Sequence, residues 1–282
     1  MKTTSSEVAL ALLLLGGCGA AERADDAGFD LAGRHYPAAG LTQWALPDEL
    51  REVSGLALSE DGRLFAHGDE QAVIYELDFV SGRAVKRFAF GNPAVPGDFE
   101  GIAFVGPRLF LITSSGDLLE GREGAPGEHV LHRAQRTGLG ERCEIEGLDY
   151  DPGARALLIL CKQARQQELA GAIAVLAWSP ETQAPVPDAQ MVLPWMPADG
   201  EPEAVNPSAL TRSAAGTLVL AAARQGMLIE VDARAGTIHP IRLADDGRHP
   251  QAEGIALAAD GTLLVADEGR RGRGRLSAYR PD

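Results

Sequence analysis

The sequence has little lysine, no basic stripe and no helical periodicity. Among its 282 residues only Lys2, Lys86 and Lys162 are lysines, and the formal charge at pH 7 is -14. This balance argues against a nucleic-acid-binding protein, because the phosphate backbone requires a clustered positive surface. No segment repeats its apolar residues every three to four positions, which argues against helical bundles and helical solenoids. An all-β fold is therefore expected.

Familiar catalytic signatures are also missing. None of the 6 histidines lies in an HExxH pair or a similar metal-binding spacing, and the sequence contains no GxSxG turn. These absences disfavour an enzyme. His249, which closely precedes Glu253, stays open as an acid–base group.

Long hydrophobic runs are absent except for one near the N-terminus. This run, Val8–Gly17, is too short for a membrane-spanning helix and is typical of an export signal. The letters LGGC at Leu15–Cys18 resemble the lipobox of bacterial lipoproteins, in which Cys18 is lipidated and becomes the mature N-terminus. An ordinary cleaved signal peptide with an incidental cysteine is the alternative. We expect a signal peptide over residues 1–17, and a lipidated cysteine with a flexible tether over residues 18–38.

The residue after this cysteine bears on the location of the protein. It is Gly19, and no aspartate is present there to mark retention in the inner membrane. We therefore expect an envelope lipoprotein of the outer membrane that faces the periplasm.

The two remaining cysteines fit such an oxidising compartment. Cys143 and Cys161 flank two predicted strands joined by the turn Asp151–Gly153. They would face each other across this hairpin, so a disulfide is expected. Two buried free thiols are the alternative.

One pattern recurs five times along the chain: a small or acidic residue, glycine or alanine, an apolar strand, a turn and a second apolar strand. The glycine or alanine positions are Gly55, Gly101, Gly147, Ala209 and Gly254. Their spacing of about 45 residues, with one longer interval, is typical of β-propeller blades. Asp-Gly turns between the strands favour hairpins, because glycine takes the positive φ that these turns need.

The ends of the chain predict how the ring closes. The last repeat ends at Asp282 without a fourth strand, whereas residues 40–46, GLTQWAL, stand before the first repeat. We expect this segment to complete the last blade, because closure removes an open sheet edge. The prediction is one propeller domain over residues 39–282 with five four-stranded blades. Six blades stay open, since the long third interval also holds the apolar run AIAVLAW.

The leading residue of each repeat is expected at one mouth of the central channel, because the first strand of a blade lies nearest the axis. These residues are Ser54, Glu100, Glu146, Ser208 and Glu253. Antiparallel pairing brings the end of the second strand to the same mouth. The residues expected there are Asp69, Glu70, Ser114, Ser115, Lys162, Arg224, Asp267 and Glu268. The mouth should therefore be acidic, with two basic residues in it.

Three glutamates around a narrow channel repel one another unless something compensates their charge. A bound cation is one solution, and oxygen ligands of this kind suit Ca²⁺. Glu100, Glu146 and Glu253 are thus the candidate metal ligands. The alternatives are neutralisation by Lys162 and Arg224, or carboxylates that accept backbone N–H bonds from neighbouring blades.

Several motifs together carry a family resemblance. The segments VSGLA…HGDE, GDFEGIA, CEIEGLDYDP…LLILCK, NPSAL…GTLVLAA and HPQAEGIAL…GTLLVADE resemble the SdiA-regulated family of bacterial β-propeller proteins. The resemblance runs from Trp44 to Tyr279 and implies an exported, often membrane-anchored propeller in which a channel cation is plausible. It implies no particular reaction. Calcium-dependent lactonases, which are more distant propellers, pair asparagines with their glutamates, and here only Asn206 and Asn92 are candidates for that role.

Three functions stay open at this point. The first is a non-enzymatic envelope propeller that binds a ligand, a cation or a protein at its acidic mouth, and the missing catalytic motifs favour it. The second is a calcium-dependent hydrolase with Ca²⁺ on the three glutamates and His249 or Asp267 as base. The third is a structural envelope module whose channel is closed by salt bridges. A propeller can take any of these roles.

Overall fold

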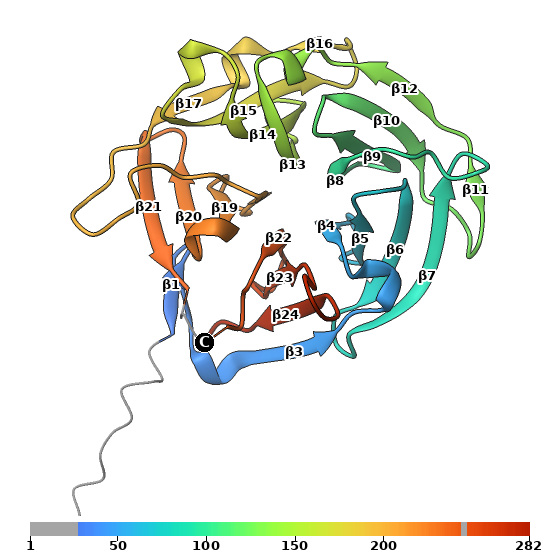
Figure 1. Ribbon diagram of the computed structural model, residues 1–282, viewed down its shortest axis with the longest axis horizontal. Helices are drawn as coiled ribbons and strands as arrows, with labels where there is room; N and C mark the ends of the chain where they lie inside the picture. The colour runs from blue at the N-terminus through green and yellow to red at the C-terminus, as the bar shows by residue number, and fades with distance from the viewer. Residues whose placement is uncertain (1–27, 244–246) are drawn as a thin grey trace, which may run out of the picture.

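The computed structural model describes residues 28–243 and 247–282, and nearly all of its regular structure is β-strand. Five sheets surround a central axis, each with its first strand innermost (Figure 1). The predicted five-bladed propeller is thus confirmed. Each of five apolar core clusters lies mainly between two neighbouring blades, so burial of apolar surface holds the ring together.

Each blade is an antiparallel sheet of four principal strands. Blade 1 contains β4 (Val53–Leu58), β5 (Leu64–Gly68), β6 (Val73–Asp78) and β7 (Arg83–Phe90). Blade 2 contains β8 (Phe99–Val105), β9 (Arg108–Thr113), β10 (Asp117–Arg122) and β12 (Arg133–Arg136). Blade 3 contains β13 (Cys143–Asp151), β14 (Ala156–Ala164), β15 (Ala172–Ser179) and β17 (Met191–Pro194).

The remaining two blades follow the same plan. Blade 4 contains β18 (Ala209–Arg212), β19 (Leu218–Ala222), β20 (Met227–Asp232) and β21 (Thr237–Arg242). Blade 5 contains β22 (Ala252–Leu257), β23 (Leu263–Asp267), β24 (Arg275–Tyr279) and β3 (Leu41–Ala45). Short 3-10 helices lie between strands: η1 (Ala38–Gly40), η2 (Asp48–Leu50), η3 (Leu139–Glu141), η4 (Gln167–Leu169), η5 (Pro187–Ala189) and η6 (Ala223–Gln225). Within the two described ranges, none of the helices has the length and apolar character to cross a bilayer.

The ring closes as the sequence predicts. β3 pairs antiparallel with β24, from Leu41 opposite Tyr279 to Ala45 opposite Arg275. The strand nearest the C-terminus therefore lies beside a strand from the start of the domain (Figure 1). Trp44 also reaches blade 1, because a Cβ placed on Gly82 would lie only 2.1 Å from its Cγ atom. β3 thus joins blade 5 and contacts blade 1.

The long third interval adds to one blade and does not create a sixth. The run AIAVLAW lies in β15, the third strand of blade 3. The proline-rich stretch after it forms the short strand β16 (Ala184–Pro185) and η5 before the chain returns in β17. The alternative of six blades is therefore wrong.

Residues 28–38 differ from the expected tether. They form a hairpin of β1 (Phe29–Leu31) and β2 (Arg34–Tyr36), in which Leu31 and Tyr36 are buried against blades 4 and 5. The Tyr36 hydroxyl donates a hydrogen bond of 2.8 Å to the Gly261 carbonyl. The folded region therefore begins before residue 39. Cys18 and the predicted signal peptide lie outside the described residues.

One segment is divided between two blades. Residues 129–135, HVLHRAQ, have the length and composition of a single strand, but the first part, β11 (His129–Val130), pairs parallel with β7 of blade 1. Only the later part, β12, pairs with β10 of blade 2. Val130 is buried in the core between these blades, and Leu131, which lies between β11 and β12, is 94% exposed.

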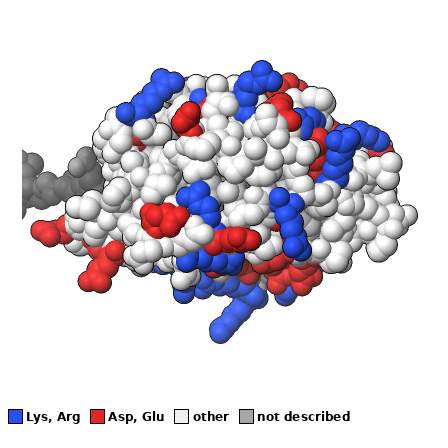
Figure 2. Space-filling view, turned by 90° about the horizontal axis from the view of Figure 1, so that it is seen from above, with Lys and Arg blue, Asp and Glu red and all other residues white. Residues whose placement is uncertain are grey.

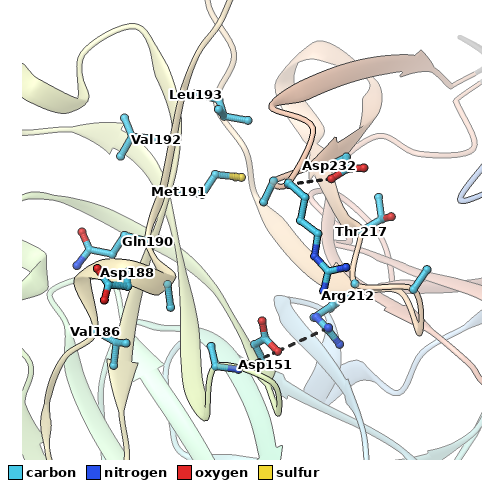
Figure 3. A pocket seen from close by; sticks show the side chains of 16 residues that line it. Asp151, Val186, Asp188, Gln190, Met191, Val192, Leu193, Arg212, Thr217 and Asp232 are labelled. Carbon is cyan, nitrogen blue, oxygen red and sulfur yellow. Dashed lines mark hydrogen bonds and ion pairs between the residues drawn. The ribbon is translucent and has the colours of Figure 1, made fainter.

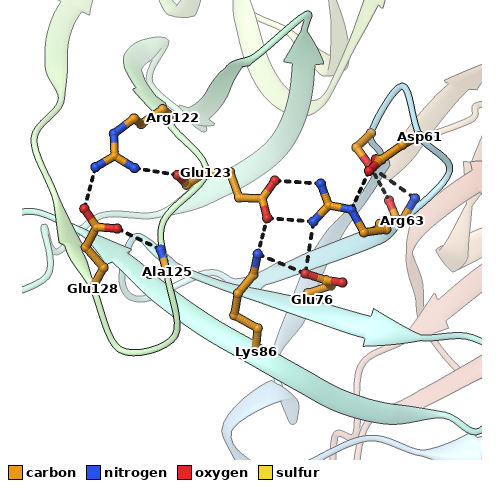
Figure 4. A network of polar contacts seen from close by, with 9 residues as sticks. Asp61, Arg63, Glu76, Lys86, Arg122, Glu123, Ala125 and Glu128 are labelled. Carbon is orange, nitrogen blue, oxygen red and sulfur yellow. Dashed lines mark hydrogen bonds and ion pairs between the residues drawn. The ribbon is translucent and has the colours of Figure 1, made fainter.

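Ion pairs fasten the loop between β10 and β11 to blade 1 (Figure 4). Arg63 donates two hydrogen bonds, of 2.6 and 2.8 Å, to the two carboxylate oxygens of Glu123. Lys86 binds the same carboxylate and also lies 3.0 Å from Glu76. The Arg63 hydrogen bonds lower the pKa of Glu123 to about 2. Charges of both signs are also mixed along the outer edge of the disc that Figure 2 shows.

The predicted disulfide is present. Cys143 and Cys161 are bonded, with their Cα atoms 5.6 Å apart. They are not direct partners in the ladder, because Cys143 lies opposite Ala164 and Cys161 opposite Ile145. Irregular pairing between these positions brings the two sulfur atoms together. The bond ties the start of β13 to the end of β14, close to the axis.

Candidate functional site

The leading residue of four repeats lies at a β-bulge. In blade 1, Val53 pairs with Gly68 and Gly55 with His67, so Ser54 has no partner in β5. The same interruption leaves Glu100, Glu146 and Glu253 without a partner in the neighbouring strand. A bulge turns the extra side chain away from the regular alternation of the strand. The bulges therefore explain how these residues, near the start of the innermost strands, come to face the axis.

The glycine after each bulged residue lets the innermost strands approach one another. A Cβ on Gly101 would lie 2.6 Å from the backbone nitrogen of Leu148 in the next blade, and one on Gly254 would lie 2.9 Å from Leu56 Cγ. Both distances are shorter than real Cβ contacts. The repeated Glu-Gly pair thus combines a side chain aimed at the axis with close packing between blades.

Four of the five predicted axial residues meet in one place, and we call them the carboxylate ring: Ser54, Glu100, Glu146 and Glu253. They line a cavity of about 10 Å³ at the axis. This is close to the smallest volume that holds one water molecule. A larger ligand would therefore have to lie on the face of the disc above the ring.

The contacts of the carboxylate ring differ from one glutamate to the next. Lys162 Nζ donates to Glu146 Oε1 at 2.5 Å and lies 3.8 Å from Glu144. Glu100 accepts a hydrogen bond of 2.7 Å from the Ser54 hydroxyl. Of the three ring carboxyl groups, Lys162 thus contacts only that of Glu146. One predicted alternative, neutralisation by Lys162, applies to Glu146 directly.

Burial disfavours the charged forms of these carboxyl groups. Together with the nearby charge of Glu146, it raises the pKa of Glu253 to about 7. Burial also raises the pKa of Glu100 well above its ordinary value, again with Glu146 adding to the effect. Burial raises the pKa of Glu146 as well, although the hydrogen bond from Lys162 opposes this. The ring therefore holds protons near neutral pH and can exchange them for another positive charge.

Ser208, the fifth predicted axial residue, has a structural role. Its hydroxyl donates a hydrogen bond of 2.7 Å to the Ala252 carbonyl and accepts one of 3.1 Å from the Ala223 N–H. These bonds join the innermost strand of blade 4 to that of blade 5. Because the side chain is buried and engaged, Ser208 adds no polar group to the ring.

The two predicted bases also lie in a buried hydrogen-bond chain. His249 Nδ1 lies 2.8 Å from Asp267 Oδ2, and His249 Nε2 lies 2.6 Å from the Tyr279 hydroxyl. Asp267 also accepts a bond of 3.3 Å from the Gln251 N–H. Both nitrogens of the imidazole are engaged, so this hydrogen-bond chain fixes the position of the segment that precedes β22.

The other predicted mouth residues lie around the ring. Asp69 and Glu70 line a separate depression of about 300 Å³ beside blade 1, together with Glu49 and Glu52. Burial raises the pKa of Asp69. Three further predicted residues have polar partners or lie at the surface: Ser114 bonds Asp98, Glu268 accepts from Gln251, and Arg224 is exposed in η6.

A calcium site remains a prediction. In residues 28–243 and 247–282, no three His, Cys, Asp or Glu side chains are grouped so that they could hold a metal ion. The Lys162 ammonium already lies against Glu146, so a metal would have to compete with it. Asn206, a candidate partner of the glutamates, accepts a hydrogen bond of 3.3 Å from Gln225 instead.

His67 is a polar residue beside the ring that the sequence analysis missed. It pairs with Gly55 in the ladder, is 0% exposed, and its Nδ1 lies 2.9 Å from the Gly68 carbonyl. Within the described part of the chain its Nε2 has no hydrogen-bond partner, and burial lowers the pKa of the imidazole to about 4. The residues at this register position in the other blades are apolar: Ile112, Leu160, Ala221 and Ala266. A comparison of the repeats at this position could have identified it.

Comparisons with solved structures support the propeller fold and no more than the fold. No family model and no curated protein matches the chain. Among solved structures, the glutaminyl cyclase of Myxococcus xanthus is similar at a TM-score of 0.55 and 19% identity, over 86% of this chain and 94% of that one. The PQQ-bound aldose sugar dehydrogenase of Streptomyces coelicolor is similar at a TM-score of 0.57 and 15% identity, over 87% of this chain and 100% of that one. A luciferin-regenerating enzyme is similar at a TM-score of 0.53 and 10% identity, over 86% of this chain and 95% of that one.

Proposed function

We propose that the propeller is a binding protein that recognises a small cation, or a cationic group of a larger ligand, at the carboxylate ring. The observation that carries this proposal is that three largely buried carboxyl groups surround the axial cavity, while Lys162 contacts only one of them, Glu146. An incoming cation replaces protons held by Glu100 and Glu253, so charge is compensated without opening the fold. The small volume of the axial cavity limits the part that enters to an ion or an ammonium group.

Calcium chloride and methylammonium chloride are the two probes for calorimetry on the full chain. We expect saturable binding of one of them, with release of protons and with affinity that rises between pH 5 and pH 8, because the ring carboxyl groups must ionise. Replacement of Glu100, Glu146 and Glu253 together by glutamine should abolish binding. The matched control is Glu141→Gln at an exposed position of η3, which should bind as the parent does. Equal affinity of the triple variant and the parent would show that the ring is not the site.

A second candidate function is proton-transfer catalysis at the ring. The observation that favours it is the pKa of Glu253, raised to about 7, because a group that titrates there both takes up and gives up protons at neutral pH. The similar fold of the Myxococcus xanthus glutaminyl cyclase suggests peptides with an N-terminal glutamine as first substrates to test. Release of ammonia by the parent and not by Glu253→Gln would favour catalysis over binding.

We also propose that the chain belongs to the SdiA-regulated family and acts as a lipoprotein of the cell envelope. The ordered repeat motifs and the Cys143–Cys161 disulfide support this, since such bonds persist in oxidising compartments. Cys18→Ala should move the protein from the membrane fraction to the soluble periplasmic fraction. If the variant fractionates with membranes as the parent does, Cys18 is not the anchor.

A further inference from the structure

A second cavity lies between blades 3 and 4, on the face of the disc opposite to the carboxylate ring. Its volume is about 760 Å³, which is in the range of small-molecule sites. The turns β13–β14, β18–β19 and β20–β21 line it, together with the segment 186–193 (Figure 3). Because β13 runs from Glu146 in the ring towards Asp151 at the cavity, the two sites lie at opposite ends of the same strand.

Arg212, at the end of β18, supplies the cavity with a positive charge (Figure 3). Its side chain is only 21% exposed, and its Nη2 lies 3.6 Å from Asp151 Oδ1, which is longer than a hydrogen bond. Asp151 is thus its ion-pair partner, and among the described residues its guanidinium group donates no hydrogen bond. A largely shielded guanidinium with unused donors favours binding of an additional acceptor.

The turn after β18 makes room for this side chain. Gly216 has a φ of +93°, and a Cβ on it would lie 3.0 Å from the Nη2 atom of Arg212. A side chain at position 216 would therefore both strain the turn and press against the guanidinium. The local sequence thus keeps Arg212 free to reach the cavity.

Three carboxylates near Arg212 are held by their own turns. Asp151 accepts the Gly153 N–H at 2.8 Å, and Asp232 accepts those of Arg234 and Ala235 at 2.8 and 3.0 Å. Asp149, whose charge Arg212 also stabilises, accepts the Tyr150 N–H at 2.7 Å. These backbone bonds satisfy part of each carboxylate. Arg234 lines the same cavity and adds a second guanidinium-bearing residue.

The opposite wall of the cavity carries the apolar side chains of Val186, Met191 and Leu193, which lie across from Arg212 in Figure 3. Asp188 and Gln190 belong to the same wall. We propose that the cavity binds a small amphipathic carboxylate, with its head group at Arg212 and Arg234 and its chain against this wall. A planar carboxylate matches the paired donors of a guanidinium group, and the apolar side chains of the wall remove the chain from water.

Octanoate is the probe, with acetate as a head group without a chain and octan-1-ol as a chain without a carboxylate. Calorimetry on the full chain should show saturable octanoate binding at least about tenfold tighter than either control. Arg234→Gln and Arg212→Gln should each weaken it by roughly tenfold or more, as expected for a charged hydrogen bond. Because Arg234 is exposed, its replacement should leave the fold intact.

Two further variants make the test specific. Arg136→Gln, at a side chain that is 91% exposed and outside the cavity, should leave octanoate binding unchanged. Ala215→Trp, which places a large ring at an exposed position of the cavity lining, should abolish it. The proposal is overturned if octanoate binds no better than octan-1-ol, or if Arg234→Gln and Ala215→Trp both bind it as the parent does.

Discussion

A chain that begins at Pro47, and so lacks β3, should not form a stable monomeric propeller. Without β3, the β24 strand becomes an open edge whose backbone groups lose the five register pairs from Leu41 to Ala45. The packing of Trp44 over Gly82 in blade 1 is lost as well. We expect a loss of more than about 5 kcal/mol, which is comparable to the whole stability of many domains.

Circular dichroism melts and size-exclusion chromatography measure this effect, with two control chains. A chain that begins at Gly28 keeps both the β1–β2 hairpin and β3, and a chain that begins at Pro37 lacks the hairpin alone. Thr42→Pro tests the strand without truncation, since proline at this hydrogen-bonded position opposite Ala278 removes a donor of the ladder. If the chain from Pro47 melts at the same temperature as the chain from Pro37, closure by β3 contributes little.

The second large effect concerns the pH dependence of stability. Glu253→Gln should be more stable than the parent above pH 7 and equally stable near pH 4. The folded state of the parent keeps a proton on Glu253 up to about pH 7, whereas an unfolded glutamate releases it near its ordinary pKa of 4.5. Parental stability therefore falls as the pH rises from about 4.5 to about 7, and glutamine removes this loss. The gain is up to about 3 kcal/mol, and Glu100→Gln should act in the same direction.

Urea unfolding between pH 4 and pH 9 measures this gain. Glu123→Gln is a control variant whose free energy of unfolding should change in the opposite direction. Arg63 lowers the pKa of Glu123 to about 2, so its carboxylate stabilises the fold above pH 4.5 and this contribution fades as the pH falls towards 2. Glu123→Gln should thus be less stable than the parent at pH 7. Parallel pH profiles for the parent and Glu253→Gln would contradict the raised pKa of the ring.

Repeat spacing and turn chemistry were enough to predict the blades and their closure, and they favoured five blades while six stayed open. Each unit buries its apolar strands against its neighbours, so the period of the sequence is also the period of the fold. The Glu-Gly pairs likewise identified Glu100, Glu146 and Glu253 as axial residues. Side-chain partners could not be predicted in this way. Whether Lys162 would neutralise Glu146 or another glutamate depends on the local path of two bulged strands.

Other features depend on contacts between blades that the spacing does not encode. The segment His129–Gln135 reads as one strand, yet the burial of Val130 in the neighbouring core divides it. His67 was overlooked because a lone histidine in an apolar strand carries no motif. The cavity at Arg212 joins residues of blades 3 and 4 that are distant in sequence. Here tertiary packing, and not local pattern, determines the arrangement.

The pairing of β11 with β7 bears on the order in which the chain folds during its synthesis. Blade 1 receives its outermost strand from residues that follow β10 of blade 2, so its β7 edge stays open until His129 and Val130 have been translated. The Arg63–Glu123 ion pair can likewise form only after β10 of blade 2 has been translated. The first two blades therefore mature together as one unit. A nascent chain that stalls between Phe90 and His129 exposes an unpaired edge to aggregation or to chaperones.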